Sequence, residues 1–193
     1  MRVSARVILL VVATCVFLVG CDLTEPTDET NPECGADLEK GSFEAEITGY
    51  VDKSFEGAAV FETVQATTGE PIFFLRLSDA NNSGEIYRNI LFERFRHNTP
   101  DIGIYDLANL AKSDNQDMDR FAGTYNDTDI SGEFKTAGGT LQICSANTET
   151  LTGGFDFHAY ELVQGNDGEQ DTVQVRITGK FRAEQGDTGI IIY

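Results

Sequence analysis

The sequence contains no tryptophan, two histidines and four cysteines among its 193 residues. Zinc in proteins is bound mainly by histidine and cysteine side chains, so this small supply argues against a zinc site. Aromatic burial depends instead on 13 phenylalanines and six tyrosines. The composition therefore predicts a core packed mostly by phenylalanine, with no metal held by the usual histidine and cysteine ligands.

Positive charge is scarce as well. Fourteen lysines and arginines oppose 32 aspartates and glutamates, which gives a formal net charge of −18. A surface of this charge repels polyanions such as nucleic acids. The sequence therefore predicts no nucleic-acid partner.

The common catalytic signatures are missing from the chain. It has no Gly-x-Ser-x-Gly nucleophile motif, no phosphate-binding loop and no dinucleotide fingerprint. These motifs position a nucleophile or a cofactor phosphate. We therefore expect a protein that is not an enzyme and that needs no cofactor.

The N-terminus has the features of a bacterial export signal. Arg2 and Arg6 precede an apolar run at residues 7–20, which is short for a membrane span and ends in Leu18-Val19-Gly20-Cys21. This motif resembles the lipobox of bacterial lipoproteins. The resemblance implies cleavage of residues 1–20 as a signal peptide and acylation of Cys21, for example with palmitate. It also implies a membrane partner through the lipid and a place in the Gram-negative cell envelope, most simply the outer membrane, facing the periplasm or the surface.

Residues 21–41 contain many acidic residues, Pro26 and Pro32, and almost no large apolar side chains. Such a segment buries too little surface to fold by itself, so we interpret it as a flexible acidic tether. The remaining residues, 42–193, are long enough for one domain.

Two cysteines are left once the signal peptide, with Cys15, and the lipidated Cys21 are set aside. Cys34 and Cys144 form a single pair in an exported chain, where thiols tend to oxidise. The sequence predicts a disulfide between them, with two free buried thiols as the alternative.

From residue 42 onward the dominant hydrophobic period is two. Short runs rich in β-branched and aromatic residues are bounded by Gly, Asn, Asp or Pro, and no helical stripe extends far. This pattern predicts an all-β domain of about ten short strands, either an antiparallel sandwich or a barrel. The predicted core consists of Phe43, Ile47, Val60, Phe73, Leu75, Leu77, Ile90, Phe92, Leu141, Ile143, Phe155, Phe157, Val173, Val175, Ile177 and Phe181.

Residues 42–184 also resemble the small all-β lipoproteins of unknown function found in Gram-negative bacteria. The similarity depends on glycine and aromatic motifs, namely "GIYDL" at 103–107, "GFDF" at 154–157 and "ITGKF" at 177–181. It implies an all-β fold and an envelope location. It implies no activity and no catalytic residues.

Two heptapeptides, at residues 79–85 and 127–133, share the pattern Asp-x-(Asn/Asp)-x-Ser-Gly-Glu. This is how a calcium loop of the EF-hand type begins, but position twelve of such a loop requires a glutamate. Ile90 and Gly138 stand there instead. We therefore predict β-turns, in which aspartate and asparagine cap the backbone and glycine supplies a positive φ. Weak calcium sites completed by Glu85 or Glu133 are the alternative, with the candidate ligands Asp79, Asn81, Ser83, Asp127, Asp129 and Ser131.

Two further groups of polar residues have simple interpretations. Asp156, His158 and Tyr160 alternate along one predicted strand, so they point the same way as a solvent-facing row. Arg88, Arg94 and Arg96 also share a face if their segment is a strand. We expect these arginines to pair with the surrounding carboxylates, with an acidic glycan as the alternative contact.

Together these features predict a lipid-anchored envelope protein whose β domain is a binding or structural module without catalysis. An envelope protein or a glycan is the expected partner. One alternative is a lipocalin-like carrier that holds a small apolar ligand inside a barrel. The other is an envelope hydrolase that uses surface carboxylates.

Overall fold

The structure is a computed structural model that describes residues 34–80, 86–110, 120–130, 132–164 and 170–189. The predicted signal peptide, the predicted lipidation site Cys21 and residues 21–33 of the predicted tether lie outside the described residues. Within these ranges, no helix has the length and apolar character that a membrane span requires.

The described chain consists of nine β-strands and one short 3₁₀ helix. In chain order they are η1 (Gly35–Asp37), β1 (Ser42–Gly49), β2 (Lys53–Gln65), β3 (Pro71–Ala80), β4 (Ile86–Phe95), β5 (Gly103–Asp106), β6 (Ala122–Asp127), β7 (Gly132–Ala146), β8 (Thr150–Gln164) and β9 (Gln170–Gln185). The all-β class predicted from the two-residue period is confirmed.

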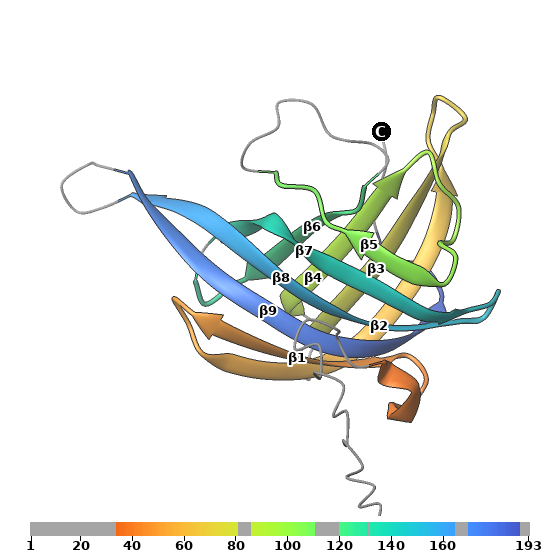
Figure 1. The fold of residues 1–193 in the computed structure, drawn as a ribbon, viewed down its shortest axis with the longest axis horizontal. Helices are drawn as coiled ribbons and strands as arrows, with labels where there is room; N and C mark the ends of the chain where they lie inside the picture. Colours follow the sequence, from red (N-terminus) through yellow and green to blue (C-terminus); the bar gives the residue numbers. More distant parts are fainter. Residues whose placement is uncertain (1–33, 81–85, 111–119, 131, 165–169, 190–193) are drawn as a thin grey trace, which may run out of the picture.

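Eight of these strands close into an antiparallel barrel. Their order is β7-β6-β4-β3-β2-β1-β9-β8, and β8 pairs again with β7, so the ring has no free end. In Figure 1 the wall of β7, β8 and β9 crosses in front of the wall of β2, β3 and β4 at a steep angle. The pairing of β7 with β8 thus decides between the sandwich and the barrel.

The ninth strand, β5, lies outside the ring. Strand β7 pairs with β6 through residues 132–135 and with β5 through residues 140–143, so β5 and β6 share one edge of β7. Beyond β5 the chain joins β6 by a single parallel bridge between Leu107 and Phe121. Figure 1 shows β5 running alongside β7 at the front of the barrel.

The strands are fewer and longer than the sequence predicts, because some glycines lie inside strands. Strands β7, β8 and β9 have 15, 15 and 16 residues. Gly138 and Gly139 adopt φ values of 134° and 133° in the middle of β7, where the register with β8 shifts. Residues other than glycine rarely adopt a positive φ of this size. The two glycines therefore let β7 bend at this point without ending.

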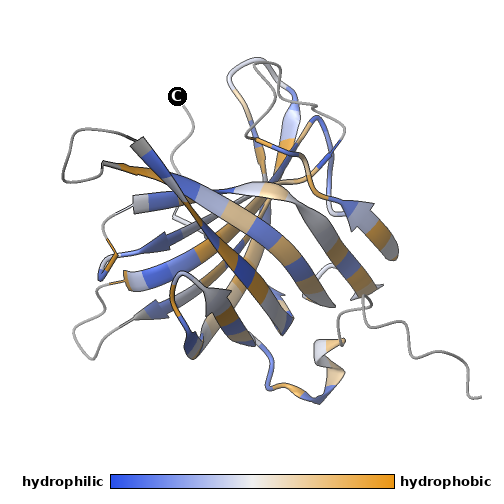
Figure 2. Ribbon diagram, turned by 60° about the vertical axis from the view of Figure 1, so that its left-hand side comes forward, coloured by the Kyte–Doolittle hydropathy of each residue, from blue (hydrophilic) through white to orange (hydrophobic). Residues whose placement is uncertain are grey.

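All of the predicted core residues are buried except Val60 and Val173, which are partly exposed. In β2 the inward face belongs to Phe55, Ala59 and Phe61, so Val60 points outward. Gly57 and Ala59 occupy inward positions of β2 but add little apolar surface. The hydrophobic pattern of the sequence therefore predicted the wrong face there. Figure 2 shows polar and apolar residues alternating along the strands.

Aromatic rings from opposite walls meet inside the barrel. The ring of Phe92 on β4 lies 5.6 Å from those of Phe155 and Phe157 on β8, centroid to centroid. The ring of Phe55 on β2 lies 6.1 Å from that of Tyr125 on β6. Because these strands are not neighbours in the ring, side chains fill the space between the walls.

Phenylalanine and glycine face each other across the β8–β9 ladder. Phe155 pairs with Gly179, and Gly153 pairs with Phe181. A Cβ atom at Gly179 would lie 2.5 Å from Phe155 Cζ, and one at Gly153 would lie 2.7 Å from Phe181 Cζ. Each ring therefore lies across the glycine of the neighbouring strand, where any other residue would push it away.

Residues 34–41, which composition assigned to the tether, instead pack on the barrel. Gly41 N donates a hydrogen bond to Arg182 O at 2.7 Å, and Arg182 Nη1 donates to Leu38 O at 3.1 Å. Asp37 pairs with Lys180 at 2.8 Å, and this hydrogen bond lowers the pKa of the Asp37 carboxyl. The apolar anchor, Leu38, is a single residue, so the average composition of the segment hides it.

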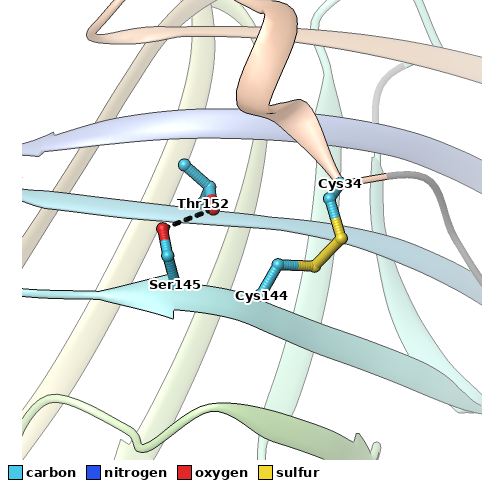
Figure 3. Close-up of a disulfide and its surroundings, with 4 residues drawn as sticks. All are labelled: Cys34, Cys144, Ser145 and Thr152. Atoms are coloured by element: carbon cyan, nitrogen blue, oxygen red, sulfur yellow. Dashed lines mark hydrogen bonds between the residues drawn. A yellow bond between two sulfur atoms is a disulfide. The ribbon is translucent and has the colours of Figure 1, made fainter.

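A disulfide joins this N-terminal segment to β7, as Figure 3 shows. The Sγ atoms of Cys34 and Cys144 are 1.97 Å apart, their Cα atoms are 6.1 Å apart, and 110 positions separate them in the chain. Beside it, the hydroxyls of Ser145 and Thr152 form a hydrogen bond of 2.7 Å between β7 and β8. The pair is the one expected from the cysteine count.

Candidate functional site

Asp79 and Asp127, the first residues of the two heptapeptides, lie on either side of Arg88 at one end of the barrel, which we call the mouth. Asp79 ends the inward face of β3, and Asp127 is the last residue of β6. Arg88 on β4 stands directly between them, because the ladders pair Asp79 with Arg88 and Arg88 with Asp127. Lys53 at the start of β2 adds a second positive charge to this group.

We define the mouth cluster as Lys53, Asp79, Arg88, Tyr125, Asp127 and Asp129. Its strand residues all point inward, because they continue the two-residue period of the buried core side chains on their own strands. The cluster therefore covers the apolar core at this end.

Asp127 is the centre of the mouth cluster, and its side chain is fully buried. Its Oδ2 accepts hydrogen bonds from Lys53 Nζ at 3.0 Å and from the Tyr125 hydroxyl at 2.8 Å. Its Oδ1 accepts one from Asp129 N at 2.8 Å. That last bond is the aspartate-capped turn predicted from the sequence.

Arg88 connects the charged mouth to the aromatic core. Its Nη1 donates to Asp79 Oδ2 at 3.0 Å, and its Nε lies 3.5 Å from Asp127 Oδ2. Asp79 Oδ1 also accepts a hydrogen bond from Arg88 N at 2.8 Å. On the other side, the guanidinium carbon lies 5.9 Å from the centre of the Phe55 ring, which is within range of a cation–π contact.

The pKa shifts of Asp127 and Lys53 favour the charged forms of these two groups. Burial alone would raise the pKa of Asp127, but hydrogen bonds from Lys53 and Tyr125 outweigh it and lower this pKa overall. Burial would lower the pKa of Lys53, but its bonds to Asp127 and Asp129 raise it. Burial and the bond to Asp127 both raise the pKa of Tyr125, so the phenol stays protonated. Near neutral pH Asp127 and Lys53 thus form an ion pair, beside a neutral Tyr125.

The described part of the mouth cluster does not favour the calcium alternative. Asp79, Asp127 and Asp129 are each paired with Lys53 or Arg88, whose cationic groups lie where a metal ion would need to be. The described residues contain no group of three or more His, Cys, Asp or Glu side chains arranged to hold a metal. The other candidates, Asn81, Ser83 and Ser131, lie outside the described residues.

A further carboxylate faces the interior near the mouth. Glu161 follows Phe157 and Ala159 at a period of two on β8, and its carboxylate lies directly against Gly132. Its Oε2 is buried without a hydrogen-bond partner among the described residues. Burial raises the pKa of Glu161, a bond from the Glu133 backbone opposes this, and repulsion from the Glu133 carboxylate adds to it.

The three arginines expected on one face separate in the structure. Arg88 belongs to the mouth cluster, while Arg94 lies inside, over the rings of Tyr105 and Phe121 at 5.1 and 5.4 Å. Arg96 follows the end of β4 with a φ of 62°, so its side chain leaves the strand face and pairs with Glu70 at 3.0 Å. The prediction that these arginines meet carboxylates holds for Arg88 and Arg96.

The row of Asp156, His158 and Tyr160 lies on the outside of β8, as the alternation predicts. His158 is exposed, and Asp156 forms two hydrogen bonds with Arg176 of β9, at 2.7 and 3.0 Å. The row is therefore part of a surface ladder of polar pairs.

The sequence does not single out Lys53 or Tyr125, although both hold Asp127. For Tyr125 a signal exists, because a residue two positions before a buried aspartate on a strand shares its face. For Lys53 no local signal exists, since 74 positions separate it from Asp127.

Comparison of the chain with protein-family models, with curated proteins and with solved structures gives no match.

Proposed function

We propose that the protein is a lipid-anchored component of a Gram-negative cell envelope. In this proposal the barrel is a binding or structural module without catalysis, and acyl chains on Cys21 hold it to the membrane. Two or three chains anchor a protein firmly, because each buried methylene contributes about 0.8 kcal/mol.

The packed interior of the barrel carries the proposal. A carrier of apolar ligands needs an empty lumen, whereas rings on β4 and β8 approach to 5.6 Å across the barrel. These contacts favour a rigid module that binds at its surface over a lipocalin-like carrier.

The charges of the mouth cluster support the absence of catalysis. Carboxylates that perform hydrolysis work as pairs whose pKa values differ, one of them raised. Asp127 has a lowered pKa and bonded neighbours, which suits a structural role. Among the described residues, Glu93 and Glu161 have raised pKa values, through burial and repulsion from Glu133, so the hydrolase alternative would depend on one of them. Glu93→Gln or Glu161→Gln would then abolish the activity.

The disulfide is consistent with an envelope location. Disulfides persist in oxidising compartments such as the periplasm and are rare in reducing ones. The Cys34–Cys144 bond therefore fits a chain that is exported.

The anchor is tested by Cys21→Ser, with Cys15→Ser as the matched control. Cys21→Ser is expected to lose metabolic labelling with palmitate and to leave the membrane fraction, whereas Cys15→Ser keeps both properties. Globomycin, which blocks the lipoprotein peptidase, should make the unprocessed form accumulate. Unchanged labelling and membrane partition of Cys21→Ser would refute the anchor.

The choice between surface module and carrier is tested with N-phenyl-1-naphthylamine, which fluoresces in apolar cavities. We expect no saturable increase in fluorescence with the folded protein. Saturable, stoichiometric binding that a fatty acid displaces would replace the proposal with the carrier.

A further inference from the structure

Strand β5 has an unpaired edge in the part of the chain that the structure describes. It stands at one end of the sheet order and pairs only with β7. In an antiparallel ladder, alternate residues direct their backbone groups to the same neighbour. Leu107 N bonds to Gly139 O, so the register directs Tyr105 toward β7 and directs the N–H and C=O of Ile104 to the open edge.

The side chains of this edge strand are unusually apolar for an exposed position. Ile102, the residue before β5, and Ile104 within it are 68% and 60% exposed, more than any other large hydrophobic residue described. Tyr105 points the other way and packs on Phe121 with ring centroids 5.2 Å apart. Proteins usually blunt an open edge with lysine or proline, whereas this edge presents two isoleucines.

The charge around the edge selects the partner. Asp101 and Asp106 are exposed and flank the two isoleucines, and residues 98–110 contain no lysine or arginine. A second copy of the chain would bring the same aspartates and the same net charge of −18, which opposes self-association at low ionic strength. An extended segment with apolar side chains at alternate positions and basic residues at its ends fits both the backbone and the charge.

We propose that the free edge of β5 binds an extended, positively charged segment of a partner protein by adding it as a further strand. Backbone hydrogen bonds to Ile104 supply the attachment, and Asp101 and Asp106 pair with basic residues at the ends of the segment. The proposal rests on the proposed function in that it names the binding surface of the module. It is tested separately, because lipidation of Cys21 and strand addition have different measurements.

The probe is the fluorescein-labelled peptide Lys-Val-Thr-Val-Thr-Val-Lys, titrated with the full-length protein in detergent at low salt and followed by fluorescence anisotropy. We expect saturable binding that slows deuterium exchange at residues 103–106. The charge-reversed peptide Glu-Val-Thr-Val-Thr-Val-Glu should bind at least about tenfold more weakly. A peptide N-methylated at alternate residues, which lacks the donors, should not bind.

The matched variants are Ile104→Pro and Ile104→Val. Proline removes the outward N–H without touching the bonds to β7, so the fold persists and binding is lost; valine keeps both the N–H and the apolar face. Leu162→Thr, at a 56% exposed position of β8 away from β5, should bind like the unmodified protein.

Three results would overturn the proposal. They are equal binding of the N-methylated peptide, unchanged binding by Ile104→Pro, and a dimer in sedimentation that Ile104→Pro abolishes. The last would assign the edge to a second copy instead.

Discussion

Strands β8 and β9 pair along 15 residues, whereas β6 pairs with β4 along six and with β7 along four. We call the β8–β9 pair the long wall; it is held by a continuous ladder and by rings that lie over glycines of the opposite strand. We call β6 with its neighbours β4 and β7 the short wall; its ladders are short, and side chains complete it. At the mouth, Asp127 of β6 is tied to Lys53 and Arg88; at the other end, Arg94 lies over Tyr105 and Phe121.

The difference shows how one barrel tolerates unequal strands. Where the backbone ladder is long, the inward side chains serve packing. Where it is short, buried charges and cation–π contacts hold the strands together, and they are sensitive to the loss of one partner. Changes in the two walls should therefore differ in kind as well as in size.

The largest effect is expected from opening the disulfide that joins the N-terminal segment to β7. Cys34→Ser with Cys144→Ser should lower the free energy of unfolding by about 4 kcal/mol, because the bond closes a long loop in the unfolded chain. Urea unfolding followed by circular dichroism measures the loss. Equal stability of the two proteins, or free thiols in the unmodified protein by non-reducing mass spectrometry, would contradict this expectation.

In the long wall, a substitution that disturbs packing should destabilise the protein. Gly153→Ala places a Cβ atom against Gln142 O and 2.7 Å from Phe181 Cζ, which is too close for either group. We expect a loss of about 3 kcal/mol, typical of overpacking in a tight core. Gly103→Ala is the control, because its Cβ would meet only the Tyr105 ring at 3.9 Å, and its stability should be unchanged.

In the short wall, the loss of a buried charge should destabilise the protein. Asp127→Asn leaves Lys53 and Arg88 without their buried partner, and we expect a loss of about 2 kcal/mol, reduced from the fully buried case because both cations are partly exposed. Asp129→Asn removes a carboxylate whose side chain is 59% exposed and should cost less than about 0.5 kcal/mol. Equal losses in the two variants would mean that burial at the mouth is not decisive.

Comparison of the unmodified protein with Asp127→Asn also predicts how stability changes at acidic pH. The pKa of Asp127 is lowered in the folded protein, so its contribution is complete above the unfolded value of 3.8 and is lost as pH falls through the folded value. The unmodified protein should therefore lose stability below about pH 4 more steeply than Asp127→Asn. Parallel profiles for the two proteins would argue against the lowered pKa.

The smallest effect is expected from calcium. Because Lys53 and Arg88 already neutralise the described aspartates of the mouth, millimolar calcium should leave the melting temperature nearly unchanged. Magnesium at the same ionic strength is the control. A rise of several degrees with calcium alone would restore the two heptapeptides as metal sites.

Much of the fold follows from local spacing. The two-residue period identified the all-β class and six of the ten phenylalanines of the core, because alternation on a strand fixes which face a side chain takes. It missed Phe55, Phe61, Phe121 and Phe134. It went wrong where small residues hide the period, as at Gly57 and Ala59 in β2, and where Gly138 and Gly139 continue a strand that they seemed to end.

By itself, the sequence determined that the chain forms strands, that phenylalanine packs them and that the two aspartate-rich heptapeptides could not be complete EF-hand loops. Only the tertiary structure decided that the sheet closes into a barrel, that Lys53 and Arg88 neutralise those aspartates, and that β5 keeps an open edge among the described residues. The reason is distance along the chain. Spacing over a few residues sets the direction of a side chain, but the choice of neighbouring strand depends on closure of the whole sheet, which brings together residues as far apart as Lys53 and Asp127.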